Sequence, residues 1–250
     1  MRLNKRQVST LQAMGIPVWK ERTPSVLADV VNEVQPEEVM PDYIGTPDAI
    51  VPEAELPGPV QDTSTWDWSS LEDAVSDCRL CALHEGRSQT VFGTGNRQAE
   101  WMLIGEAPGA EEDKQGVPFV GKAGQLLDRM LMAIGLQREQ VYIANIVKCR
   151  PPENRDPSPE EAAACSAYLK RQIELVNPRV ILVLGKVAAH NLLGTEEALG
   201  KLRGAPYLYA DTGIPVIVTY HPAYLLRKPS EKRKSWEDLK LAVKLTGGSI

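Results

Sequence analysis

Four short apolar runs, separated by segments of helical length, constrain the fold of this 250-residue chain more than any other feature. The runs are residues 101–104, 141–147, 180–184 and 216–220. The segments expected to be helices are residues 121–134, 158–176, 186–193 and 235–245. Strands that are apolar on both faces are typical of a parallel sheet covered by helices on each side. We therefore expect an α/β fold of three layers, with a parallel sheet between helices.

A polar residue or a glycine stands at the end of each expected strand. These residues are Glu106, Asn145, the pair Gly185-Lys186, and His221. The carboxyl ends of parallel strands meet at one rim of the sheet, where open α/β folds bind ligands. One such residue is usually structural, as a loop anchor or a turn residue. Their recurrence at corresponding positions predicts a binding site at this rim.

Charge and proline content divide the chain into three parts. Residues 32–62 contain eight acidic side chains, six prolines and no Lys or Arg, a composition that cannot bury a core. Residues 1–31 carry a net charge of +3, and residues 63–250 are neutral overall. We expect an N-terminal helical peptide at 1–31, a disordered acidic linker at 32–65 and a folded domain at 66–250. The basic run at 227–234 is either a phosphate contact or a solvated surface.

Neither a membrane segment nor a secretory signal is expected. No run approaches the eighteen apolar residues that a transmembrane helix needs, and the first residues lead into no apolar core. The expected location is therefore the cytoplasm, where disulfides are disfavoured. The four cysteines are Cys78, Cys81, Cys149 and Cys165. They are scattered thiols or a Cys₄ site, and their spacing alone leaves zinc and an iron–sulfur cluster both open.

Residues 70–245 resemble the family-4 uracil-DNA glycosylases. The motifs that carry the resemblance are Cys78-x-x-Cys81, Val91-Phe92-Gly93-x-Gly95, Gly105-Glu106-Ala107-Pro108-Gly109, Val117-Pro118-Phe119-Val120-Gly121-x-Ala123-Gly124, Asn145, and His221-Pro222-Ala223-x-Leu225-Leu226. The resemblance implies a uracil-DNA glycosylase-like fold, uracil-containing DNA as substrate, and hydrolysis of the N-glycosidic bond in base excision repair. It also implies a structural [4Fe–4S] cluster held by the four cysteines.

The same resemblance assigns roles in binding uracil. Phe119 would stack on the flipped base, as a glycosylase must extrude its target nucleotide. The Asn145 side chain would hydrogen-bond to N3–H and O4 of uracil together. Cytosine presents the opposite order of donor and acceptor, so a fixed Asn145 would leave its buried groups unpaired. Glu112 would stand near C5 and exclude a thymine methyl, although the pair Glu111-Glu112 is also compatible with a solvated helix start.

The catalytic and DNA-contacting residues follow from the same motifs. His221 would donate to uracil O2 and stabilise the leaving anion, together with the backbone N–H of Ala107. Glu106 would position or activate the attacking water, unless it holds its own loop. We expect DNA contacts from an apolar wedge with a cation beside it, formed by Leu225, Leu226 and Arg227.

Residues 11–24 resemble the N-terminal peptide of the psi subunit of the bacterial DNA polymerase III clamp loader. The resemblance rests on Leu11, Ile16 and Trp19, with Met14 where leucine is common. It implies docking on the clamp-loader ATPase subunits, with the chi subunit as a further candidate partner. The alternative is a peptide packed on the chain's own domain. Two functions follow: a uracil-DNA glycosylase tethered to the replisome, or a psi-type accessory subunit that uses a glycosylase fold as a binding body.

Overall fold

The computed structural model of the chain describes residues 62–248, which all lie in one compact unit. The expected N-terminal peptide, most of the expected linker, and the docking residues Leu11, Ile16 and Trp19 lie outside the described residues. The first described residues already belong to the domain. The hydroxyl of Thr63 donates to the carbonyl of Ala167, and Arg171 donates to the carbonyl of Trp66.

A six-stranded sheet with the order β1-β3-β2-β4-β6-β5 forms the centre of the domain. The strands are β1 (Thr94–Gly95), β2 (Trp101–Gly105), β3 (Tyr142–Asn145), β4 (Val180–Leu184), β5 (Pro206–Tyr209) and β6 (Ile214–Thr219). The four central strands pair in parallel, as the apolar runs predicted. The strand order reverses at the boundary between β2 and β4, which is the topological switch point of the sheet.

The sheet is mixed, because the expected parallel strands are joined by an antiparallel strand at each edge. β1 pairs antiparallel with β3, and β5 pairs antiparallel with β6. β1 has only two residues, and β5 has partly or fully exposed side chains throughout. Edge strands face water on one side, so neither needs the continuous apolar run that identified the central four.

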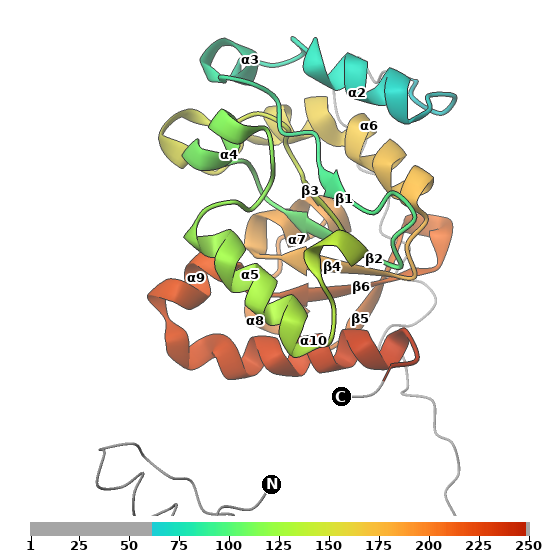
Figure 1. The fold of residues 1–250 in the computed structure, drawn as a ribbon, viewed down its shortest axis with the longest axis vertical. Coiled ribbons are helices and arrows are strands. Elements are labelled where there is room, and N and C mark those ends of the chain that lie inside the picture. Colours follow the sequence, from blue (N-terminus) through green and yellow to red (C-terminus); the bar gives the residue numbers. More distant parts are fainter. Residues whose placement is uncertain (1–61, 249–250) are drawn as a thin grey trace, which may run out of the picture. The chain divides into compact units, whose positions relative to one another are not determined.

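Helices cover both faces of the sheet (Figure 1). They are α2 (Trp68–Ser76), α3 (Leu83–Gly86), α4 (Ala110–Gln115), α5 (Lys122–Ala133), α6 (Pro159–Val176), α7 (Lys186–Leu193), α8 (Leu199–Leu202), α9 (Pro222–Arg227) and α10 (Lys232–Leu245). Four short 3₁₀ turns are η1 (Arg138–Gln140), η2 (Pro152–Asn154), η3 (Ala210–Thr212) and η4 (Pro229–Glu231). The short helices α3, α4, α8 and α9 lack enough periodicity to be predicted from sequence.

Successive side chains of the central strands enter two separate cores, which confirms the three layers. Met102 and Ile104 of β2 pack with buried residues of α2, α6 and α7. Trp101 and Leu103 of the same strand pack with buried residues of α5 and α10 on the opposite face. This alternation is the period of two expected for an extended chain. No helix in the described part of the chain is long and apolar enough to cross a membrane.

Local sequence signals place the long helices. Ser158 caps α6 and accepts from the N–H of Glu161, whose carboxylate accepts from the N–H of Ser158 in return. This reciprocal pair satisfies two of the free N–H groups at the start of a helix. Arg155 adds two hydrogen bonds to the same carboxylate, so the helix start also anchors the long loop before it.

Candidate active site

The sequence-predicted rim residues come together at the carboxyl ends of the parallel strands. Gly105 ends β2 and lies in register with Asn145 at the end of β3. A Cβ atom on Gly105 would lie 2.4 Å from Asn145 Oδ1 and 2.6 Å from Phe119 Cζ. The Phe119 and His221 rings are 5.5 Å apart and inclined at 33°. Gly185, at the end of β4, lies directly against His221. The absence of a side chain at Gly105 therefore lets Asn145 and Phe119 approach its backbone closely, and we call this cluster of Gly105, Asn145, Phe119 and His221 the cradle.

Asn145 presents a buried acceptor without a partner. Its side chain is 1% exposed, and Oδ1 makes no hydrogen bond to any described residue. Leaving a buried polar atom unpaired costs about 1–3 kcal/mol, and native proteins rarely tolerate it without a function. Because this oxygen faces the cradle beside the Phe119 ring, it is suited to accept a hydrogen bond from a planar ligand.

Two residues that the sequence did not single out hold Asn145 in place. The ammonium of Lys148 donates to the main-chain oxygen of Asn145 at 2.9 Å and to Oε1 of Gln172 at 2.6 Å. Gln172 in turn donates to the carbonyl of Phe92 and to the hydroxyl of Tyr142. Lys148 is 1% exposed, and a buried lysine is a signal that only burial reveals.

His221 is a neutral hydrogen-bond donor at neutral pH. Burial, with a contribution from the positive charge of Arg227, lowers its pKa to about 4, against an opposing effect of Glu112. Nδ1 accepts from the N–H of Ala223, which makes His221 the cap of α9. The ring proton of the neutral imidazole is therefore on Nε2. This arrangement fixes both the orientation and the tautomer of the side chain.

Glu106 is poised to exchange a proton near neutrality. Burial raises its pKa to about 7, with further contributions from the charge of the Asp156 carboxylate and from a hydrogen bond with it. A carboxyl group with a pKa near the working pH suits general base catalysis. Asp156 lies in the loop between β3 and α6, and nothing in its sequence context marks it as a neighbour of Glu106.

Glu112 binds the loop that carries Phe119. Its Oε1 accepts from the N–H groups of Val120 and Gly121, at 2.9 and 3.1 Å. The solvated alternative is therefore wrong for Glu112, while Glu111 is exposed and pairs with Lys114. These bonds show what holds the carboxylate, and its expected place near C5 of the base stays a prediction.

The expected DNA-contacting segment divides into buried and exposed residues. Leu225 is 1% exposed and packs in the protein interior, so of the two leucines the structure favours Leu226 as the wedge, and the DNA contact of this segment stays a prediction. One residue later on α9, Leu226 is 43% exposed, and Arg227 is exposed beside it. Consecutive side chains of a helix point in different directions, so one of two adjacent leucines can be buried while the other is exposed. The pair Leu225-Leu226 in the sequence does not show which one faces the core. Ala107 lies half-buried in the turn after β2.

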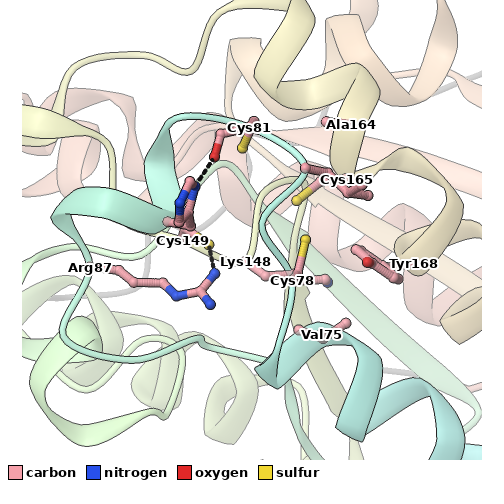
Figure 2. Close-up of a pocket in the computed structure, with 11 residues that line it drawn as sticks. Val75, Cys78, Cys81, Arg87, Lys148, Cys149, Ala164, Cys165 and Tyr168 are labelled. Carbon is pink, nitrogen blue, oxygen red and sulfur yellow. Dashed lines mark hydrogen bonds between the residues drawn. The ribbon is translucent and has the colours of Figure 1, made fainter. Parts of the chain in front are cut away.

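The four cysteines line one pocket (Figure 2). In Figure 2 the sulfurs of Cys78 and Cys165 point toward each other, and the Cys149 sulfur accepts from Arg87 Nη1 at 3.0 Å. Burial raises the pKa of the Cys149 and Cys165 thiols, so a cation is needed to hold them as thiolates. Arg87 and Lys148 supply positive charge at the pocket wall.

The four cysteines share one pocket without forming a metal-binding group. Among the described residues, no set of three or more His, Cys, Asp or Glu side chains is arranged so that it could hold a metal ion. A structural zinc ion needs four ligands at about 2.3 Å from one centre. A [4Fe–4S] cluster binds each of four thiolates through a different iron, so the same four cysteines are the donors that either group would use.

Comparisons with known proteins agree with this geometry. Residues 92–240 match the family model described as the uracil DNA glycosylase superfamily. The Type-4 uracil-DNA glycosylase of Archaeoglobus fulgidus is 46% identical over 187 residues, covering 71% of this chain and 94% of that protein. The Type-4 enzyme of Thermotoga maritima is 46% identical over 69% of this chain and 91% of its own length. A Type-5 uracil-DNA glycosylase of Pyrobaculum aerophilum is 32% identical over 52% of this chain and 64% of its own length. The chain belongs to the uracil-DNA glycosylase superfamily, a family of hydrolytic enzymes.

Proposed function

We propose that the chain removes uracil from DNA by hydrolysing the N-glycosidic bond of deoxyuridine. The observation that carries the proposal is the unpaired, buried Oδ1 of Asn145 in a cradle beside Phe119 and a neutral His221. A uracil in this cradle donates N3–H to that oxygen and accepts at O4 from the amide nitrogen of Asn145. Cytosine has an acceptor at N3 and a donor at N4, so it leaves buried groups unpaired and is rejected.

Bond cleavage separates a sugar with oxocarbenium character from a uracil anion. The Nε2–H of His221 donates to O2 of the base, and the N–H of Ala107 adds a second donor. A water molecule attacks C1′ and transfers one proton to the carboxylate of Glu106, while the electron pair of the glycosidic bond leaves with the base. Because His221 is already neutral, it stabilises the anion by hydrogen bonding and need not lose a proton first.

An excision assay on a single-stranded oligonucleotide with one deoxyuridine tests the proposal. After treatment with hot alkali, which breaks the backbone at an abasic site, strand cleavage should appear with the deoxyuridine strand and not with a strand that carries deoxycytidine at the same position. Asn145→Ala should lower kcat/KM by about 100-fold, since it removes two hydrogen bonds inside a buried pocket. Failure of the purified wild-type protein, with its cysteine site loaded, to excise uracil would refute the assignment.

The exposed end of α9 supports a DNA contact. Leu226 and Arg227 project from the helix that His221 caps, so an apolar wedge and a cation lie next to the reacting site. Filling the vacated base stack with Leu226 would stabilise the flipped state. Leu226→Ala should weaken binding of a uracil-containing duplex, whereas the matched change Met132→Ala, at an exposed apolar side chain on α5, should not.

The four cysteines fit a [4Fe–4S] cluster. Such a cluster would serve a structural role, connecting the segment of Cys78 and Cys81 to the loop after β3 through Cys149 and to α6 through Cys165. The support is the shared pocket and its two cations. Purification without oxygen should give about four iron and four sulfide per chain, and Cys165→Ser should lose both. One zinc per chain without sulfide would instead indicate a structural zinc ion at the four cysteines.

Tethering to the replisome remains a proposal based on residues 11–24. The support is the resemblance of this segment to the psi peptide and the acidic, proline-rich segment that follows it. Trp19→Ala should abolish co-purification with the clamp-loader ATPase subunits and leave uracil excision unchanged. Co-purification of a protein without excision activity would instead favour the psi-type accessory subunit, and the same pull-down examines the chi subunit.

A further inference from the structure

The loop at residues 117–121, between α4 and α5, holds Phe119 in an unusual backbone conformation. Phe119 has φ = 55°, in the left-handed region that residues other than glycine seldom adopt. Such a residue persists only where its surroundings impose the conformation. A Cβ on Gly124 would lie 1.7 Å from the carbonyl oxygen of Phe119, so α5 packs directly against this peptide group.

A guanidinium group binds the carbonyl side of this loop. Arg138 of η1 donates through Nη1 to the carbonyl of Phe119 at 3.1 Å and through Nη2 to the carbonyl of Pro118. Nη1 also donates to Asp128 of α5 at 3.1 Å. The Arg138 side chain is only 21% exposed, so its planar fork is held by these three partners.

The two sides of the loop are therefore bound by groups of opposite charge. Glu112 accepts from the N–H groups of Val120 and Gly121, while Arg138 donates to the carbonyls of Pro118 and Phe119. Together they fix the peptide planes on both sides of the Phe119 Cα atom. The direction of the Cα–Cβ bond, and with it the place of the ring, follows from those planes.

We propose that Arg138 is a positioning residue for uracil excision, which acts by holding the Phe119 ring at the place where it stacks on the base. This inference rests on the proposed function, because the ring has a stacking role only if a base enters the cradle. Arg138 contacts the main chain of the loop and acts on the base through Phe119. Without its two bonds, Phe119 returns to a negative φ and its ring leaves the cradle formed with Gly105 and His221.

The composition of the chain offers a direct measurement. Phe92 and Phe119 are the two phenylalanines of the sequence, so incorporation of 4-fluorophenylalanine gives one ¹⁹F signal from each. Phe92 lies in the core on the other face of the sheet and serves as an internal control. In Arg138→Met the Phe119 signal should shift or broaden while the Phe92 signal stays unchanged. The value of kcat/KM should fall by roughly 10- to 100-fold, since two charge-assisted hydrogen bonds are lost.

Two further variants keep the test decisive. Arg138→Lys retains the charge but cannot bind both carbonyls with a planar fork, so it should reproduce most of the loss. Arg179→Met removes an exposed arginine that pairs with Glu100 and should leave both signals and the activity unchanged. If Arg138→Met does not fold, the ¹⁹F signals and the kcat/KM of a folded Arg138→Lys test the proposal in its place.

The proposal is overturned if the folded variant keeps the wild-type Phe119 signal, or if that signal moves while kcat/KM stays at the wild-type value. A wild-type protein that excises no uracil refutes the proposed function instead. In that case the ¹⁹F signals still report whether Arg138 holds the ring, so the two failures are distinguishable.

Discussion

Gly105→Ala should block the uracil cradle without unfolding the protein. The added Cβ would lie 2.4 Å from Asn145 Oδ1 and 2.6 and 2.7 Å from two carbon atoms of the Phe119 ring. An ordinary contact for a Cβ begins near 3.4 Å, so the amide or the ring must move by about 1 Å. A misplacement of about 1 Å in an active site can cost 100-fold in rate, or about 2.7 kcal/mol. We therefore expect kcat/KM for uracil excision to fall about 100-fold.

The assay is single-turnover excision from a deoxyuridine oligonucleotide, with thermal unfolding measured on the same sample. Gly200→Ala is the matched control, because a Cβ on that helical glycine has no neighbour within 4 Å. That change should leave excision unaltered and slightly raise the melting temperature, since alanine favours a helix over glycine. Excision by Gly105→Ala within twofold of wild type would refute the argument that the base occupies this cradle.

Four further predictions test the groups around the cradle. The pKa of Glu106 is raised to about 7, so log kcat/KM should rise with pH up to about 7 and then level off. Glu106→Gln should lose this rise. An unchanged pH profile in that variant would exclude Glu106 as the titrating group. The raised pKa also means that the native state binds this proton more tightly than the unfolded chain, so the free energy of unfolding falls as pH rises from 4.5 to 7. Urea denaturation at pH 8 should therefore show Glu106→Gln to be more stable than wild type. Asn145→Asp replaces the amide donor by a carboxylate oxygen. In the oligonucleotide assay it should lower kcat/KM for uracil by at least about 100-fold, and wild-type activity would contradict the prediction. Lys148→Met leaves the carbonyl of Asn145 and Oε1 of Gln172 without their shared donor, and urea denaturation should show a loss of about 2–3 kcal/mol, against no loss if the two bonds contribute nothing.

The parts of the fold that depend on local pattern were predictable. The bounds 180–184 and 186–193 agree with β4 and α7, and the capping box at Ser158 marks the start of α6. Apolar runs and caps are local signals, because they report how a short segment meets the core and water. The edge strands β1 and β5 carry no such signal, which is why the sheet's antiparallel edges were missed.

The candidate site shows the same division. The sequence alone predicted that Glu106, Asn145 and His221 lie at one rim, since the carboxyl ends of parallel strands meet there whatever the loops do. Only the tertiary structure distinguished buried Leu225 from exposed Leu226, because solvent exposure depends on what packs against a helix.

The chain by itself thus determined the α/β architecture and the residues at the rim, which follow from the order of residues along one strand or turn, and its motifs carried the resemblance to the family. The tertiary structure decided what holds those residues in place. Lys148 reaches Asn145, Arg138 reaches the Phe119 loop, and Asp156 faces Glu106. The physical reason is that hydrogen bonds and charges act through space over a few ångströms, and the folded chain brings together groups whose separation in sequence carries no sign of the contact.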